Sequence, residues 1–147
     1  MIIRLATRRD LDAWADLRAA LWPDDAIEDH RAEAEDALNR PDGLVAYVAE
    51  TSDGVIAGFA EAALRHDYVN GCDTSPVAFV EGLYVRPEHR KADVARRLCA
   101  AVADWGRAQG CTELASDADA DNLESHAFHQ AIGFEETERV VYFRMML

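Results

Sequence analysis

Two hydrophobic patterns alternate along the chain. Runs rich in β-branched and aromatic residues, bounded by Gly, Pro or Asp, predict strands. Segments whose apolar residues recur every three or four positions, such as Leu11, Trp14, Leu17 and Leu21, predict helices. The patterns predict strands at 2–6, 44–50, 55–65, 77–85 and 111–116, helices at about 8–21, 27–38, 93–109 and 122–132, and one or two final strands from Phe134 onward, including the alternating run 140–145.

The element order is therefore β-α-α-β-β-β-α-β-α-β(-β). It predicts a mixed α/β fold, with a central sheet of about six to seven strands flanked by about four helices. At 147 residues, the chain is expected to form one domain, residues 1–147, around a single well-filled core.

The longest strand pattern, residues 77–85, is interrupted only by Glu81 and Gly82 and predicts a buried central strand. A short basic loop follows, and then a helix that begins near Asp93 and stops before Gly110. A strand, a basic turn and a helix N-terminus in succession can hold a phosphate-bearing ligand, because free backbone N–H groups and the helix dipole face the anion. An ordinary strand-to-helix crossover with a solvated basic turn has the same pattern.

Charge narrows the choice of partner. The chain has 28 acidic and 15 basic residues, for a net charge of −13. Nucleic acid and anionic membranes are poor partners for such a surface, whereas a small polycation is a good one. An acidic surface can also serve solubility alone, but here the carboxylates crowd residues 24–36.

Neither a membrane segment nor a metal site is expected. No apolar run approaches the roughly 20 residues that span a bilayer, and the N-terminus lacks the apolar region of a signal peptide. A cytoplasmic location is therefore expected. Cys72, Cys99 and Cys111 are too widely spaced for a zinc site or a disulfide framework, and Cys99 is expected to serve packing.

The basic turn resembles a known motif. The segment Arg90-Lys91-Ala92-Asp93-Val94-Ala95 is similar to the Arg/Gln-x-x-Gly-x-Gly/Ala pyrophosphate loop of the GCN5-related N-acetyltransferases (GNATs), with Asp93 in place of the first glycine. Other segments resemble the aminoglycoside 6′-N-acetyltransferases of that superfamily: Leu21-Trp22-Pro23, 65–71, Ser75-Pro76, 79–82, Ala115-Ser116-Asp117 and 133–140. The resemblance spans nearly the whole chain. It implies a GNAT fold, acetyl-CoA as co-substrate, a cationic aminoglycoside as acceptor and a homodimer.

The same resemblance assigns the cofactor contacts. It implies that acetyl-CoA is held by Leu83, Tyr84, Val85, Arg90, Lys91, Ala92, Asp93, Val94, Ala95, Arg96 and Asn122, and that an amide among residues 83–85, with Leu83 first, meets the thioester oxygen. Gly82 in mid-strand indicates a bulge or splay that opens an edge for the ligand, or simply close packing.

Asp93 complicates the turn. Its carboxylate would repel a pyrophosphate by about 1 kcal/mol or more, or it would cap its own helix and occupy the N–H groups that a phosphate uses. Weakened rather than abolished cofactor binding is predicted, with the neighbouring basic residues compensating.

The resemblance also assigns the acceptor contacts to Trp22, Tyr68, Glu81, Asp117 and Glu138, and places Asp25 where the related enzymes can carry a substrate-side histidine. Glu81 lies inside an apolar strand, so it requires a cationic ligand or a structural salt bridge. Asp117 follows a strand of a parallel pair, where ligands of α/β proteins gather, although it can equally cap its loop.

Catalysis requires a base, because alkyl ammonium groups titrate near 10. Glu81, acting through water, is the first candidate. His129 stands where many GNATs place a tyrosine that protonates the departing thiolate, and a helix histidine can instead be packed or solvent-facing. Two alternatives stay open: an acetyltransferase that acts on a polyamine or protein amine, and a non-catalytic relative that binds cations.

Overall fold

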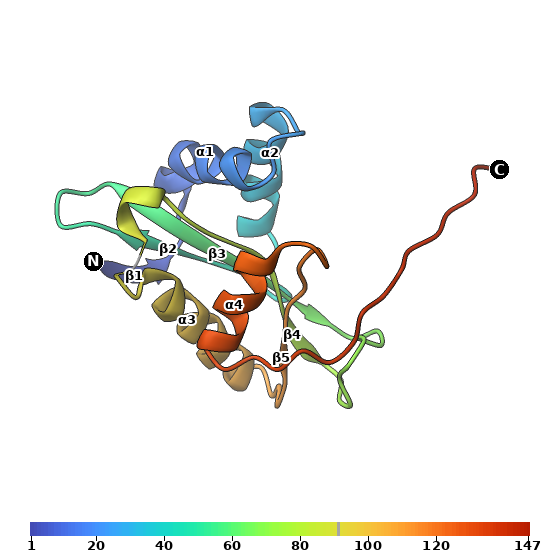
Figure 1. The fold of residues 1–147 in the computed structure, drawn as a ribbon. Coiled ribbons are helices and arrows are strands. Elements are labelled where there is room, and N and C mark those ends of the chain that lie inside the picture. The colour runs from blue at the N-terminus through green and yellow to red at the C-terminus, as the bar shows by residue number, and fades with distance from the viewer. Residues whose placement is uncertain (91) are drawn as a thin grey trace.

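The computed structural model describes residues 1–90 and 92–147, so Lys91, a predicted cofactor contact, lies outside the described residues. Figure 1 shows the arrangement of the helices and strands. In chain order they are β1 (Ile2–Leu5), η1 (Arg8–Asp10, a short 3-10 helix), α1 (Leu11–Leu21), α2 (Ile27–Leu38), β2 (Leu44–Glu50), β3 (Ile56–Arg65), β4 (Val77–Val85), η2 (Pro87–His89, also 3-10), α3 (Val94–Ala108), β5 (Leu114–Ala115) and α4 (Leu123–Ala131).

The strands lie in one sheet in the order β1-β2-β3-β4-β5. The first four pair antiparallel. Because α3 carries the chain back across the sheet, β5 runs parallel to β4. It pairs only at Ala78 with Leu114 and at Phe79 with Ala115, so beyond Phe79 the two strands separate.

Helices cover both faces of the sheet, with α1 and α2 on one side and α3 and α4 on the other (Figure 1). The alternation of side chains along a strand separates the two largest clusters of buried apolar residues. On β3, Phe59 packs with Trp14 and Leu17 under α1. Its neighbour Ala60 points the other way and packs with Leu98 and Val102 of α3. The single core expected from the sequence is therefore divided into a cluster under α1, a cluster under α3 and a third, smaller cluster of Val69, Val77 and Phe79.

The prediction of six to seven strands is wrong for the described residues, which contain five. The predicted strand at 111–116 is reduced to Leu114–Ala115, and the predicted final strands do not form. The chain after α4 instead runs along the body as far as Thr137, which lies against Gly71, and then leads away into solvent (Figure 1). A strand pattern becomes a strand only where another strand satisfies its backbone groups, and none of the described strands pairs with this segment.

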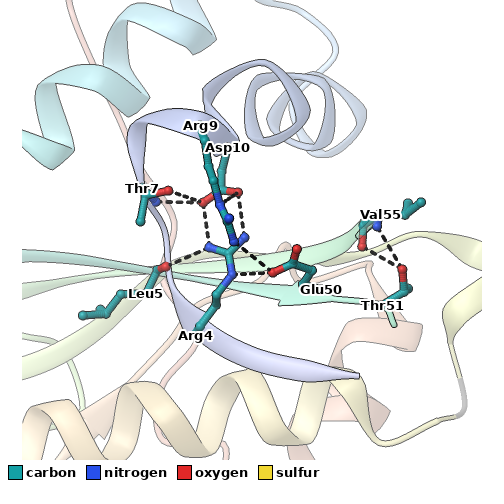
Figure 2. A network of polar contacts seen from close by, with 8 residues as sticks. All are labelled: Arg4, Leu5, Thr7, Arg9, Asp10, Glu50, Thr51 and Val55. Carbon is teal, nitrogen blue, oxygen red and sulfur yellow. Dashed lines mark hydrogen bonds and ion pairs between the residues drawn. The ribbon is translucent and has the colours of Figure 1, made fainter. Parts of the chain in front are cut away.

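A polar network fixes the N-terminus to the sheet. Figure 2 shows the Arg4 guanidinium between the carboxylates of Asp10 and Glu50, with N···O distances of 2.8 Å to both Asp10 oxygens and 2.6 Å to Glu50. Burial alone would raise the pKa of the Asp10 carboxyl, but hydrogen bonds from Arg4 and from the N–H and hydroxyl of Thr7 lower it below its ordinary value. The network therefore joins β1, η1 and β2 with a buried ion pair.

Among the described residues, no helix combines the length and apolarity needed to cross a membrane. The three cysteines are free, and Cys99 is buried in the packing of α3, as predicted.

Candidate active site

The centre of the site is an irregularity in β4. Gly82 pairs with Glu61 and Val80 pairs with Ala62, so Glu81 bulges out of the ladder without a partner residue on β3. The bulge predicted from Gly82 is therefore confirmed. Close packing is present as well, because a Cβ atom on Gly82 would lie 2.5 Å from the Trp22 ring. No side chain fits at this position without moving that ring.

A cavity of about 220 Å³ opens where β4 and β5 separate. Its walls come from β4, the segment after β5, α4 and the end of α1. Six of the residues predicted to act in the site line this one cavity: Trp22, Glu81, Leu83, Asp117, Asn122 and His129. The divergence of two parallel strands thus gathers residues that are more than a hundred positions apart in the sequence.

The predicted phosphate turn lies at the start of α3, where the first backbone N–H groups have no intrahelical acceptors. Asp93 adopts the left-handed conformation, with φ of 58°, before the helix begins at Val94. That conformation accounts for the glycine of the motif, since glycine adopts it without a steric cost. The Asp93 side chain does not cap the helix, so that alternative was wrong. It pairs instead with Arg96, with Nε and Oδ1 3.3 Å apart.

Among the other residues of the turn, some are packed against the rest of the protein and some are exposed. Val94 is buried and fixes the start of α3 in the core, while Ala92 is exposed and Ala95 partly so. Arg90 folds back over the ring of Tyr84 and donates from Nε to the carbonyl oxygen of Val85 at 2.9 Å. Tyr84 and Val85 line neither of the described cavities.

Glu81 is held at the mouth of the cavity by Arg65. The guanidinium of Arg65 donates to both Glu81 oxygens at 2.9–3.1 Å and lies over the ring of Phe79. Glu81 is exposed rather than enclosed by the apolar strand, so the structural salt bridge is the alternative that the structure shows. The pair is solvent-accessible and therefore weak, which allows another cation to compete for the carboxylate.

Trp22, which lines the cavity, belongs to a cluster of aromatic rings. Trp22 packs parallel to His30 and edge-on to Phe59, with ring centroids 6.3 Å apart in both pairs. The buried His30 donates from Nε2 to the carbonyl oxygen of Trp22 at 2.9 Å. His30 was not identified from the sequence, because its role depends on the packing of α2 against α1.

His129 reaches the cavity from α4, whose N-terminus is capped by Asn122 accepting from the Ser125 N–H at 3.2 Å. The ring lies between the edges of Phe128 and Phe134. Its Nε2 is 2.8 Å from the Ser116 hydroxyl oxygen. The histidine is therefore neither solvent-facing nor simply packed among apolar groups.

Three predicted acceptor contacts lie elsewhere. Asp25, Tyr68 and Glu138 are exposed and line neither described cavity. The last two belong to adjacent segments, since Thr137 lies against Gly71 in the loop that carries Tyr68. That loop is anchored by Glu113, which accepts from the N–H groups of Asp73 and Thr74.

A second cavity of about 440 Å³ adjoins the site between α2 and strands β2 to β4. Glu81 lines both cavities. In the wall of the second cavity, Arg18 of α1 pairs with Glu61 of β3 and Glu33 of α2. The sequence did not reveal this cluster, because it joins three elements that are distant along the chain. No group of side chains suited to a metal occurs within residues 1–90 and 92–147.

Comparison with known proteins identifies the family. Residues 11–134 match the Acetyltransferase (GNAT) family. The chain belongs to this family. It is 51% identical to the aminoglycoside N(6′)-acetyltransferase type 1 of Serratia marcescens over 99% of both chains. It is 52% identical to the protein of that name from Stenotrophomonas maltophilia over 99% of this chain and 93% of the relative.

A solved structure extends the likeness to the fold. AAC(6′)-Iy, in complex with the bisubstrate analogue CoA-S-monomethyl-acetylneamine, superimposes with a TM-score of 0.93 at 47% identity, covering 99% of this chain and 98% of that one. The GNAT resemblance read from the turn and the flanking segments is confirmed, and the mixed sheet with helices on both faces is the GNAT fold.

Proposed function

We propose that this GNAT transfers the acetyl group of acetyl-CoA to the 6′-amine of aminoglycosides and thereby gives resistance to them. The observation that supports this most directly is the cavity at the β4–β5 divergence, which gathers the residues matched to that enzyme class around an unpaired strand edge. The near-complete overlap with relatives named for this activity supports the same assignment.

The residues present fit acetyl-CoA, which supplies the activated acetyl thioester. The first turn of α3 offers N–H groups to a pyrophosphate, with Arg90 and Arg96 close by. Beyond Phe79 no described strand pairs with β4 on the β5 side, so its free groups can bind the extended arm of the co-substrate. Leu83 lies on this edge, where its amide can donate to the developing oxyanion.

The acceptor side suits a polycation. Glu81 and Asp117 bring two carboxylates to the cavity from different elements. The Trp22 ring packs against Gly82 and also lines the cavity. An ammonium group that displaces Arg65 from Glu81 would exchange one exposed ion pair for another at small cost. Glu81, through a bound water, then takes the proton that the amine must lose.

An acetylation assay tests the proposal. The protein is incubated with acetyl-CoA and kanamycin, thiol release is followed, and the acetylated position is located by NMR. We expect acetylation at the 6′-amine. A matched aminoglycoside with a hydroxyl at C6′ should not react. Turnover with spermidine but not with kanamycin would point to a polyamine acetyltransferase, and binding of kanamycin without turnover to a non-catalytic relative.

Replacing Asp93 by glycine is expected to tighten coenzyme A binding about five-fold, since a carboxylate near the pyrophosphate costs about 1 kcal/mol. Calorimetric titration of both proteins with coenzyme A measures the effect. Asp93→Asn is the matched control, because asparagine also tolerates the left-handed conformation but carries no charge. Equal tightening in the two variants assigns the effect to charge, and unchanged affinity in both would refute the repulsion.

The C-terminal segment suggests how a homodimer forms. Seven of its last eight residues are apolar and exposed: Val140, Val141, Tyr142, Phe143, Met145, Met146 and Leu147. Such a run suits a strand buried on both faces. The outer edge of β5 pairs with no described strand, because β5 is the last of the sheet order. We propose that two copies exchange these segments, each adding a strand to the other's sheet.

Analytical ultracentrifugation tests this exchange. The wild-type protein is expected to sediment as a dimer at micromolar concentration, and Phe143→Asp as a monomer, because the charge would have to be buried at the interface. Val55→Asp is the control, since Val55 is also exposed but lies in the turn between β2 and β3. A monomeric wild type, or a Phe143→Asp dimer of undiminished stability, would rule the exchange out.

A further inference from the structure

His129 is held in one tautomer by its surroundings. Its Nδ1 lies 2.7 Å from the carbonyl oxygen of Ser125, with the Ser125 hydroxyl farther away at 3.3 Å. A carbonyl oxygen can only accept, so Nδ1 carries the hydrogen and Nε2 of the neutral ring has the lone pair. The hydroxyl of Ser116, 2.8 Å from Nε2, is therefore the donor in that hydrogen bond.

The ring is also fixed in orientation. Phe128 meets it at an interplanar angle of 75° and Phe134 at 68°, with centroids 5.7 Å and 5.2 Å away. Ser116 follows β5 directly, so its backbone is fixed by the sheet. Ser116 and His129 both line the cavity, as does Leu83 of β4. A hydroxyl, an oriented imidazole and a carbonyl thus form a chain that begins at the cavity wall.

We propose that Ser116 and His129 form a proton shuttle for acetyl transfer. The inference rests on the proposed function and adds a residue to it. The resemblance to the family points to a proton-transfer role for position 129 only. The geometry adds Ser116 as the residue that contacts the reacting atoms. As the nitrogen–carbon bond forms, Ser116 accepts a proton from the attacking nitrogen while its own proton moves to Nε2 of His129. As the carbon–sulfur bond breaks, the same path returns a proton to the sulfur.

The protons balance with Glu81 in its separate role. The acceptor ammonium loses two protons on becoming an amide nitrogen. Glu81 passes the first to water, and the Ser116–His129 pair carries the second to the thiol, so one proton is released per turnover. No oxidant, metal or further reactant is required.

Several titratable or charged groups lie around the imidazole. Asp117, from the segment after β5, and Glu81, from β4, line the cavity with His129, and Cys99 reaches it from α3. Arg96 reaches the carbonyl oxygen of Ala131 at the end of α4.

The test compares Ser116→Ala, Ser116→Thr and His129→Gln with the wild type. Ser116→Ala should lower kcat about 100-fold, the scale of a lost proton-transfer group, with little change in the KM for either substrate. Ser116→Thr, which keeps the hydroxyl, should retain most of the activity. Imidazole groups titrate between about pH 5 and 8, and the corresponding limb of the kcat profile should disappear in Ser116→Ala and His129→Gln alike.

These outcomes separate the shuttle from the proposed function. If the wild type fails to acetylate kanamycin, the proposed function itself is wrong. If the wild type is active and Ser116→Ala keeps its kcat and its pH profile, the shuttle alone is overturned. A purely structural role for Ser116 would lower the melting temperature and leave the pH limb in place. If Ser116→Ala does not fold, the shape of the His129→Gln profile decides, because a retained limb would exclude the imidazole.

Discussion

Glu81→Gln is expected to lower kcat/KM for aminoglycoside acetylation by at least about 100-fold, the lower end of the range for a general base. Glutamine keeps the size of the side chain and its place on the β4 bulge, but it can neither accept a proton nor attract the ammonium. The coenzyme A dissociation constant should not change, because the turn proposed to bind the pyrophosphate lies at the start of α3. Steady-state kinetics with varied drug, together with calorimetry for coenzyme A, measure both quantities.

Glu88→Gln is the matched control for this substitution. Glu88 is exposed on η2 and lines neither described cavity, so its replacement changes the net charge equally without touching the site. It should leave kcat/KM within about two-fold of the wild type. If Glu81→Gln kept its activity, the general base would have to be another group. The bulge at Glu81 would then have only a structural role.

Arg65→Gln separates attraction from proton transfer. Arg65 is the cation that pairs with Glu81 in the free protein, and the acceptor must compete with it. Its removal should therefore lower KM for the drug and leave kcat unchanged. Charge alone could not have revealed this competition, because Arg65 is paired with Val77 in the sheet and only its long side chain reaches Glu81, which lies four residues further along β4.

The central strand, the turn and α3 could be predicted from the sequence because their signals are local. The run at Val77–Val85 specifies a buried strand, Gly82 marks the bulge, and Gly110, with φ of 86°, ends α3. The residues of the cavity could be named because a motif resemblance assigned them. Neither source predicted which groups would be hydrogen-bonded to one another, as Ser116 and His129 are.

The predicted final strands are absent because a strand depends on a distant partner. The run at 140–145 has the side chains of a strand, but backbone pairing must come from another strand, and in this chain the segment is exposed and forms no strand. The alternative that Asp93 caps α3 was wrong for a different reason. The backbone there is left-handed, with φ of 58°, and the carboxylate points to Arg96 instead.

The buried cluster beneath the second cavity predicts the largest loss of stability. Arg18 is 7% exposed and pairs with Glu61, which also accepts from Trp14 Nε1 at 2.7 Å. Arg18→Met leaves the Glu61 carboxylate buried with the indole as its remaining described donor. Removing one partner of a buried pair costs about 3–5 kcal/mol, so the melting temperature should fall on the order of 10 °C.

The loss of stability in Arg18→Met should grow as the pH rises. Burial raises the pKa of Glu61, and the opposing effects of Arg18 and Trp14 do not cancel it. The folded state then holds the proton more tightly than the unfolded state, whose glutamate titrates near 4.3. Stability therefore falls as pH rises from about 4.3 through the folded pKa. Without Arg18 the folded pKa rises further, so urea titrations should show a larger deficit for Arg18→Met at about pH 7.5 than at about pH 5.

Two controls test whether the loss of stability comes from leaving the buried Glu61 charge unpaired. Arg107→Met removes an exposed arginine that pairs with Asp104, and it should cost less than about 1 kcal/mol at either pH. The double variant Arg18→Met/Glu61→Leu should recover much of the stability, because apolar side chains can replace a buried ion pair without leaving a charge unpaired. A deficit equal at both pH values, or no recovery in the double variant, would show that Arg18 stabilises the fold through its packing rather than by neutralising Glu61.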